Sequence, residues 1–184
     1  MRDPFREGLA AGWKHIDASQ LAVDLPIEAD VVIIGSGAGG GVTAEILAAN
    51  GLKVVIVEEG PLRTSSDFKM REAEAYPDLY QESAARKTAD KAINILQGRC
   101  VGGSTTVNWT SSFRTPPRTL QWWQSAWGLK RLGVDAMAPW FAAMEQRLHV
   151  GLWPIPPNEN NAALARGAAQ LGIPVAVIPR NVKM

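Results

Sequence analysis

Alternating blocks of apolar and polar residues predict two buried strands and a helix early in the chain. A run of four β-branched residues closes the segment 30–34, and a second apolar run occupies 53–57. Uninterrupted apolar runs of this length are typical of parallel strands covered on both faces. A helical pattern follows over 42–50, with Gly51 placed to end it. The pattern therefore predicts a βαβ unit over residues 30–58.

A glycine-rich turn joins the first strand to the helix, in the spacing Gly35-x-Gly37-x-x-Gly40 with Ser36 and Ala38 between. In this motif the first glycine permits the tight turn, the second lets the backbone approach a pyrophosphate, and the third lets the helix pack on the strand. The N–H groups at the start of the helix would then face the phosphates. The turn predicts a phosphate-binding loop.

An acidic pair, Glu58 and Glu59, ends the second strand. Glu58 lies 23 residues after Gly35, where a carboxylate of such a fold accepts hydrogen bonds from the adenosine ribose. A lone glycine motif is weak evidence, but its place between two apolar strands and ahead of this acid is specific. The unit as a whole predicts that a dinucleotide binds here.

A second glycine-rich stretch occupies residues 97–109, after a short strand or extended segment expected over 92–96. Two adjacent glycines followed by hydroxyl residues indicate a backbone that a ligand approaches closely. Ser104 is expected to cap a helix. A domain that binds only NAD does not need this second loop. Its candidate binding residues are Gly102, Gly103, Ser104, Asn108, Trp109 and Thr110.

The flanking regions are predicted to be mostly helical. Residues 1–28 form a lead-in with Phe5, Leu9 and Trp13 at helical spacing. Within the charged region 62–92, residues 81–91 are a helix candidate. The remaining elements expected are a helix capped by Thr119 and ended by Gly128, with Leu120, Trp123 and Trp127 on one face, a helix opened by Pro139, a stiff connector over 153–158, a helix over 161–171 and an extended run over 173–178.

Composition narrows the classes of function. The 184 residues carry a net charge of +1, and basic and acidic residues are mixed between 63 and 99, so nucleic acid is not expected as a partner. No apolar run approaches the roughly 20 residues of a membrane span. With no Sec-type signal pattern either, the expected compartment is the cytoplasm. Apolar tryptophans such as Trp109 and Trp122 leave a peripheral contact with a membrane surface as an alternative to core packing.

Few residues are candidates for metal binding or catalysis. Cys100 is the single cysteine, and His15 and His149 are far apart, so no metal site is expected. Either histidine fits a packing or surface role. The sequence therefore nominates no catalytic residue within the chain.

Taken together, the segments ADVVIIGSGAGGG…VVIVEEGP and GRCVGGSTTVNWTSSFRTP resemble the glucose–methanol–choline (GMC) family of flavin oxidoreductases. Asn108-Trp109, Arg114 to Pro116, and the segments around Trp153 and Arg180 are similar to its long-chain alcohol oxidase branch. The resemblance covers residues 29–184. It implies an FAD/NAD(P)-binding Rossmann-like α/β fold with a parallel sheet and added helices, incomplete at its C-terminal end and preceded by the lead-in 1–28.

The resemblance also implies where FAD would lie. The pyrophosphate would rest on residues 35–40, the ribose on Glu58, and the flavin end against residues 102–104 and 108–110. Some members of the family attach the flavin to a histidine just ahead of the second glycine loop. Residues 97–100 hold none, so the FAD is expected to be non-covalent.

The family's function implies an alcohol substrate, apolar or not, whose hydride passes to the flavin while a histidine takes the hydroxyl proton. That histidine and its partner lie in a C-terminal part of the family that is not found here. Two alternatives stay open: the nucleotide domain of an NAD-dependent dehydrogenase, and a non-catalytic nucleotide-binding fragment that needs its missing part or a partner chain.

Overall fold

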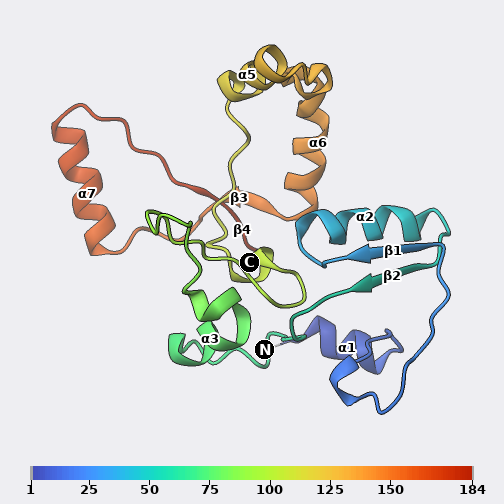
Figure 1. Cartoon of the computed structure of the whole chain (residues 1–184). Helices are drawn as coiled ribbons and strands as arrows, with labels where there is room; N and C mark the ends of the chain where they lie inside the picture. The colour runs from blue at the N-terminus through green and yellow to red at the C-terminus, as the bar shows by residue number, and fades with distance from the viewer. Residues whose placement is uncertain (1, 184) are drawn as a thin grey trace. The chain divides into compact units, whose positions relative to one another are not determined.

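A computed structural model describes residues 2–183 of the chain. It divides into two compact units, one up to Asn108 and the other from Trp109 onward. The first unit contains the predicted βαβ motif: β1 (Val31–Ile34), α2 (Ala38–Ala49) and β2 (Val54–Val57). The two strands lie side by side and run parallel (Figure 1). Their register pairs Val31 with Val54 through to Ile34 with Val57. The Rossmann-like α/β fold with a parallel sheet is confirmed, here as a small partial sheet.

Helix α2 begins at Ala38, four residues earlier than the apolar pattern predicts. The reason is that three consecutive glycines, 39–41, carry no side chains and therefore give no periodic signal, although the backbone over them is helical. Gly51, with φ +87°, ends the helix in the left-handed conformation that the sequence predicts. The early start matters because it brings the first turn of the helix directly to the carboxyl end of β1.

The N-terminal lead-in forms a short helix, α1 (Pro4–Ala10), and a single turn, η1 (Ala18–Gln20). Trp13 lies beyond α1, so the prediction that it shares a helical face with Phe5 is wrong. The two rings instead meet edge to face, 5.8 Å apart, because the chain turns back after Gly12. The turn η1 is capped by the Asp17 carboxylate, which accepts the Ser19 N–H at 3.0 Å.

Asp3 ties this lead-in to the loop after β2. Its carboxylate caps α1 through the Arg6 N–H at 3.1 Å and accepts the Ser66 N–H and hydroxyl at 3.0 and 2.7 Å. Arg6 adds an ion pair to Asp67 at 2.6 Å. A hydrogen bond from Thr64, together with those from Ser66 and Arg6, outweighs desolvation and lowers the pKa of Asp3 well below its usual range.

We expect Asp3→Asn to lower the melting temperature at pH 7. Because the folded pKa is depressed, the carboxylate stabilises the fold above the unfolded pKa of about 3.9, and this contribution is lost as the pH falls below it. The difference between wild type and variant should therefore shrink between pH 5 and pH 3 in thermal unfolding followed by circular dichroism. Asp24→Asn, at an exposed position of the same lead-in, is the control. A difference that stays constant with pH would contradict the assigned contacts.

Between the sheet and the second glycine loop, the helix is placed differently from the prediction. Helix α3 covers Glu72–Leu79, whereas residues 81–91 contain only the turn η2 (Gln81–Ala84). The predicted helix over 81–91 is wrong because Gln81 donates its N–H to Gln97 at 2.9 Å, and Ile95 donates to Arg86 at 2.8 Å. The expected strand 92–96 thus pairs back as an extended arm with one isolated bridge, between Lys87 and Asn94.

The second unit is built from helices and a pair of short strands. The helices begin earlier than predicted: α5 at Pro117 instead of after Thr119, α6 at Val134 instead of Pro139, and α7 at Glu159 instead of 161. Pro139 lies inside α6. Of the predicted stripe on α5, Leu120 is buried, whereas Trp127 is 66% exposed. The elements are α5 (Pro117–Trp127), η3 (Lys130–Leu132), α6 (Val134–Arg147), β3 (Val150–Leu152), α7 (Glu159–Gln170) and β4 (Pro179–Asn181).

Other predicted features of this unit are confirmed. Gly128 ends α5 in the left-handed conformation, as predicted. Asn158, which the sequence pattern does not single out, caps α7 by accepting the Asn161 N–H at 3.0 Å. Residues 153–158 form no helix, and 173–178 run extended before β4 pairs antiparallel with β3. Among the helices that the structure describes, none has the length and apolar character to cross a bilayer.

Candidate nucleotide-binding site

A cavity of about 510 Å³ opens at the carboxyl ends of the two parallel strands. This is where open α/β sheets bind their ligands, because the loops that follow the strands converge there. All of its lining comes from the first unit. The lining residues are Ile34, Gly35, Gly37, Ala38, Val57, Glu58, Glu59, Gln97, Gly98, Gly103, Ser104 and Thr105.

Each of the three motif glycines in the first loop is present for a different structural reason. Gly35 has φ +91°, which side-chain-bearing residues rarely adopt, and makes the turn out of β1. A Cβ on Gly40 would overlap the Gly35 carbonyl oxygen and lie 3.3 Å from Ile33 Cγ2, so the helix can approach the strand only without it. A Cβ on Gly37, by contrast, would have no atom within 4 Å. Gly37 therefore leaves space on the cavity side.

The start of α2 supplies hydrogen-bond donors to that space. Gly37 is the N-cap residue and offers no side-chain acceptor to the first turn. The first intrahelical bond at this end runs from Gly41 N–H to the Gly37 carbonyl, at 2.8 Å. The N–H groups ahead of it have no acceptor within the helix, and the helix dipole adds partial positive charge there. The arrangement suits a phosphate anion.

Glu58 lies beside this loop at the end of β2, with both carboxylate oxygens engaged. Oε2 accepts the Ser36 N–H at 2.9 Å and the Ser36 hydroxyl at 2.6 Å, and Oε1 accepts the Gly60 N–H at 3.0 Å. Desolvation alone would raise the pKa of Glu58, but these hydrogen bonds outweigh it and lower the pKa below its ordinary value. An ionised carboxylate accepts at about four positions, so one remains for a ribose hydroxyl.

The second glycine loop forms the opposite wall of the cavity. Its backbone folds tightly on itself: the Gly98 N–H donates to the Ser104 hydroxyl at 3.0 Å, and a Cβ on Gly98 would overlap the Gly103 carbonyl. Ser104 begins α4 (Ser104–Val107) but does not cap it, so that prediction is wrong. Its hydroxyl is occupied by Gly98, and Gly103 holds the N-cap position.

The two glycine loops touch each other directly. A Cβ on Gly103 would lie 3.1 Å from the Cα of Gly37, and the Gly102 N–H donates to the Ser36 hydroxyl at 2.9 Å. Cys100 belongs to the second loop and is fully buried. Burial raises the pKa of its thiol, which keeps the thiol protonated. Cys100 is therefore a buried packing residue and not a reactive thiol.

Glu59 lies at the rim of the cavity and is more exposed than Glu58. The Gln81 side-chain amide donates to its carboxylate, and Arg99 forms an ion pair with it at 3.5 Å. Arg99 belongs to the second loop, and Gln81 comes from the segment that precedes it. Glu59 thereby connects that segment to the end of β2 on the open side of the site.

The cavity gathers seven of the predicted binding residues: Gly35, Gly37, Ala38, Glu58, Glu59, Gly103 and Ser104. Ser36, Gly40 and Gly102 do not line it and instead hold its walls together. Sequence reasoning missed Ile34 and Val57, which their position at the carboxyl ends of the strands could have indicated. It also missed Gln97, Gly98 and Thr105. Of these, Gly98 could have been found, because a glycine within such a loop indicates a tightly packed backbone.

Three residues predicted at the flavin end do not line the cavity. Asn108 follows α4, and its side-chain amide donates to the Thr105 carbonyl at 3.2 Å. Trp109 and Thr110 belong to the second unit, where Arg180 donates to the Trp109 carbonyl at 3.1 Å and to the Thr110 hydroxyl at 3.2 Å. Their assignment to the flavin end stays a prediction.

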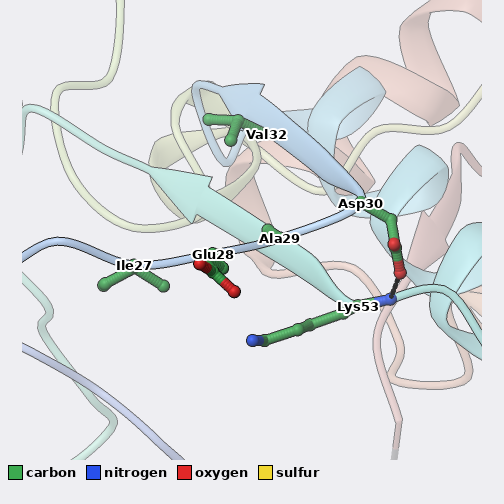
Figure 2. Close-up of a pocket in the computed structure, with 6 residues that line it drawn as sticks. All are labelled: Ile27, Glu28, Ala29, Asp30, Val32 and Lys53. Atoms are coloured by element: carbon green, nitrogen blue, oxygen red, sulfur yellow. Dashed lines mark hydrogen bonds between the residues drawn. The ribbon is translucent and has the colours of Figure 1, made fainter.

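A second cavity of about 490 Å³ lies at the opposite, N-terminal ends of the strands and is drawn in Figure 2. Asp30 accepts the Lys53 backbone N–H there at 2.7 Å, which holds the strand starts in register. The rest of its lining is Ile27, Glu28, Ala29 and Val32, away from both glycine loops. No group of metal-binding side chains occurs among the described residues, and neither histidine lines either of these two cavities.

A parallel βαβ unit, a glycine turn with an open helix N-terminus, and a carboxylate at the next strand end define the dinucleotide-binding class of α/β proteins. Within that class the comparison with known families is specific. A model described as GMC oxidoreductase matches residues 76–184, more than half of the chain, and one described as FAD binding domain matches residues 30–70. The chain belongs to the GMC oxidoreductase family, whose members are FAD-dependent enzymes.

Individual relatives agree with this family. Long-chain-alcohol oxidase FAO4A of Arabidopsis thaliana is 35% identical over 157 residues, which are 85% of this chain and 22% of that protein. An uncharacterized GMC-type oxidoreductase of Mycobacterium tuberculosis is also 35% identical, over 88% of this chain and 26% of its own length. Another, y4nJ of Sinorhizobium fredii, is 31% identical over 86% of this chain and 32% of its own. The chain thus spans a fifth to a third of these relatives.

Among solved structures, pyridoxine 4-oxidase from Mesorbium loti is similar over 61% of this chain and 23% of its own, with 30% identity and a TM-score of 0.46. The sequence matches, rather than this likeness, identify FAD as the cofactor and set the NAD alternative aside.

Proposed function

We propose that this chain holds non-covalent FAD for an oxidoreductase that acts on the CH–OH group of alcohols. The observation that carries the proposal is the meeting of both glycine loops at one cavity, with Gly103 against Gly37. A site for NAD alone would use the first loop and Glu58 without the second. The residues fit the cofactor: an open helix N-terminus, one free carboxylate position and a glycine cradle.

In this proposal each wall of the cavity binds a different part of FAD. The backbone N–H groups that open α2 hold the pyrophosphate, and Glu58 accepts from the ribose. The second loop, over 97–105, lies against the flavin end and shields it from water. The assignment of Asn108, Trp109 and Thr110 to the flavin end stays a prediction. When bound, FAD supplies the hydride acceptor that oxidation of an alcohol requires. The chain's contribution is to bind and orient it.

The proton of the alcohol requires a base that this site does not provide. The ionisable side chains that line the cavity are Glu58 and Glu59, and both are committed to hydrogen bonds or an ion pair. We therefore place the base in sequence beyond these 184 residues, in line with the greater length of the relatives. Since the Arabidopsis thaliana relative is named a long-chain-alcohol oxidase, an apolar primary alcohol is the substrate we propose.

Titration of the purified chain with FAD tests the cofactor assignment. We expect saturable quenching of flavin fluorescence at one FAD per chain and none of the corresponding signal with NADH. Reduction of a dye by dodecanol should then require a longer form of the protein that includes a histidine-bearing C-terminal region. Binding of NADH without FAD would overturn the cofactor assignment, and dye reduction by the isolated chain would overturn the placement of the base.

A further inference from the structure

The Ser36 side chain occupies the junction of three segments that are distant in sequence. Its hydroxyl donates to Glu58 Oε2 at 2.6 Å and accepts the Gly102 N–H at 2.9 Å, while its own backbone N–H donates to the same Oε2 at 2.9 Å. A hydroxyl has a single proton to donate. Because that proton points at the carboxylate, the oxygen's acceptor side faces Gly102. The two hydrogen bonds therefore run in one direction, with Gly102 donating to Ser36 and Ser36 donating to Glu58.

This junction connects the two halves of the proposed site. Glu58 stands at the ribose end, and Gly102 belongs to the second glycine loop. Gly102 contributes its backbone N–H to this contact, and the Ser36 side chain fastens the first loop to it. The bond to Glu58 is charge-assisted and belongs to the stronger class of protein hydrogen bonds.

We propose that Ser36 is a positioning residue: it orients the Glu58 carboxylate and fixes the second glycine loop before the cofactor arrives. Ser36 itself does not line the cavity, so it acts through Glu58 and Gly102 and not by touching FAD. This inference deepens the proposed FAD function and rests on it. Removal of the hydroxyl would leave the Gly102 N–H without its acceptor and Glu58 without one of its three donors.

The test compares Ser36→Thr with Ser36→Val, which have nearly the same shape and differ in the hydroxyl. Ser36→Ala removes the hydroxyl without adding bulk, and Ser65→Ala, at an exposed turn position, is the control. Two quantities are measured: the FAD dissociation constant by fluorescence titration, and the hydrogen-exchange rate of the Gly102 amide in the FAD-free chain. We expect Ser36→Val and Ser36→Ala to bind FAD about tenfold more weakly, the loss that one such hydrogen bond implies.

In the same variants the Gly102 amide should exchange faster before any FAD is added, whereas Ser36→Thr should restore both quantities. If the Gly102 amide exchanged at the wild-type rate in Ser36→Val, the assigned hydrogen bond between Gly102 and Ser36 would be wrong. Faster exchange with unchanged FAD affinity would overturn its role in positioning. Failure of the wild-type chain to bind FAD would instead count against the proposed function, and the exchange of Gly102 would still decide whether the junction exists.

Discussion

Gly37→Val is expected to abolish FAD binding while the chain remains folded. The protein itself has room for the substitution: Gly37 has φ −62° and ψ −170°, which other residues adopt, and a Cβ there would meet nothing within 4 Å. That room is the space in front of the first turn of α2. A branched side chain would fill it and keep a pyrophosphate from the N–H groups behind.

The effect should grow with the size of the side chain. We expect Gly37→Ala to weaken FAD binding in part and Gly37→Val to weaken it by at least about 100-fold, or roughly 3 kcal/mol. Flavin fluorescence titration measures the affinity. Thermal unfolding without FAD is the control, and it should change little, because the cost of replacing an N-cap glycine is about 1 kcal/mol. Retained affinity in a folded Gly37→Val chain would show that the phosphates bind elsewhere.

The βαβ unit could be predicted from the sequence because its signals are local. The β-branched runs before Gly35 and Glu58 specify buried strands, and glycine at 35 and 51 marks the turn and the helix end. Each of these follows from the conformational limits of a few neighbouring residues. The same locality explains why the cavity walls at Gly35, Gly37 and Glu58 were predicted.

The region between the loops could not be predicted because long-range pairing decides it. Residues 81–91 have a helical pattern, yet Glu82 and Ser83 adopt φ of +51° and +54° while Gln81 bonds to Gln97. Hydrogen bonds to residues more than ten positions away cannot be read from the hydrophobic periodicity of a segment. Ser104 is a similar case: its residue type favours an N-cap, but the Gly98 N–H takes its hydroxyl.

Sequence reasoning also could not separate residues that touch a ligand from those that support the site. Both kinds of residue occur in one glycine motif, and the spacing of the motif does not indicate which of them face the cavity. Gly37 opens toward the cavity, whereas Gly40 faces the Gly35 carbonyl and Ser36 faces Glu58 and Gly102. This difference predicts that variants of neighbouring positions will fail in different ways, in binding at Gly37 and in folding at Gly40.

Gly40→Ala is accordingly expected to destabilise the fold itself. The added Cβ would overlap the Gly35 carbonyl oxygen, which is backbone and cannot rotate away, and would also crowd Ile33 on β1. Helix α2 would have to move off the sheet. Overpacking of this kind typically costs 1–3 kcal/mol, so about 3 kcal/mol of lost stability is expected here because the clash is with backbone.

Gly41→Ala is the matched control, since it adds the same methyl group one residue along the same helix. Its Cβ would lie 3.8 Å from the Ser36 carbonyl oxygen, an ordinary contact, and alanine is favoured over glycine in a helix by up to about 1 kcal/mol. Urea unfolding should therefore rank Gly41→Ala at or above wild type and Gly40→Ala far below it. Equal stability of the two variants would contradict the close packing of α2 on β1, because that packing alone distinguishes the two positions.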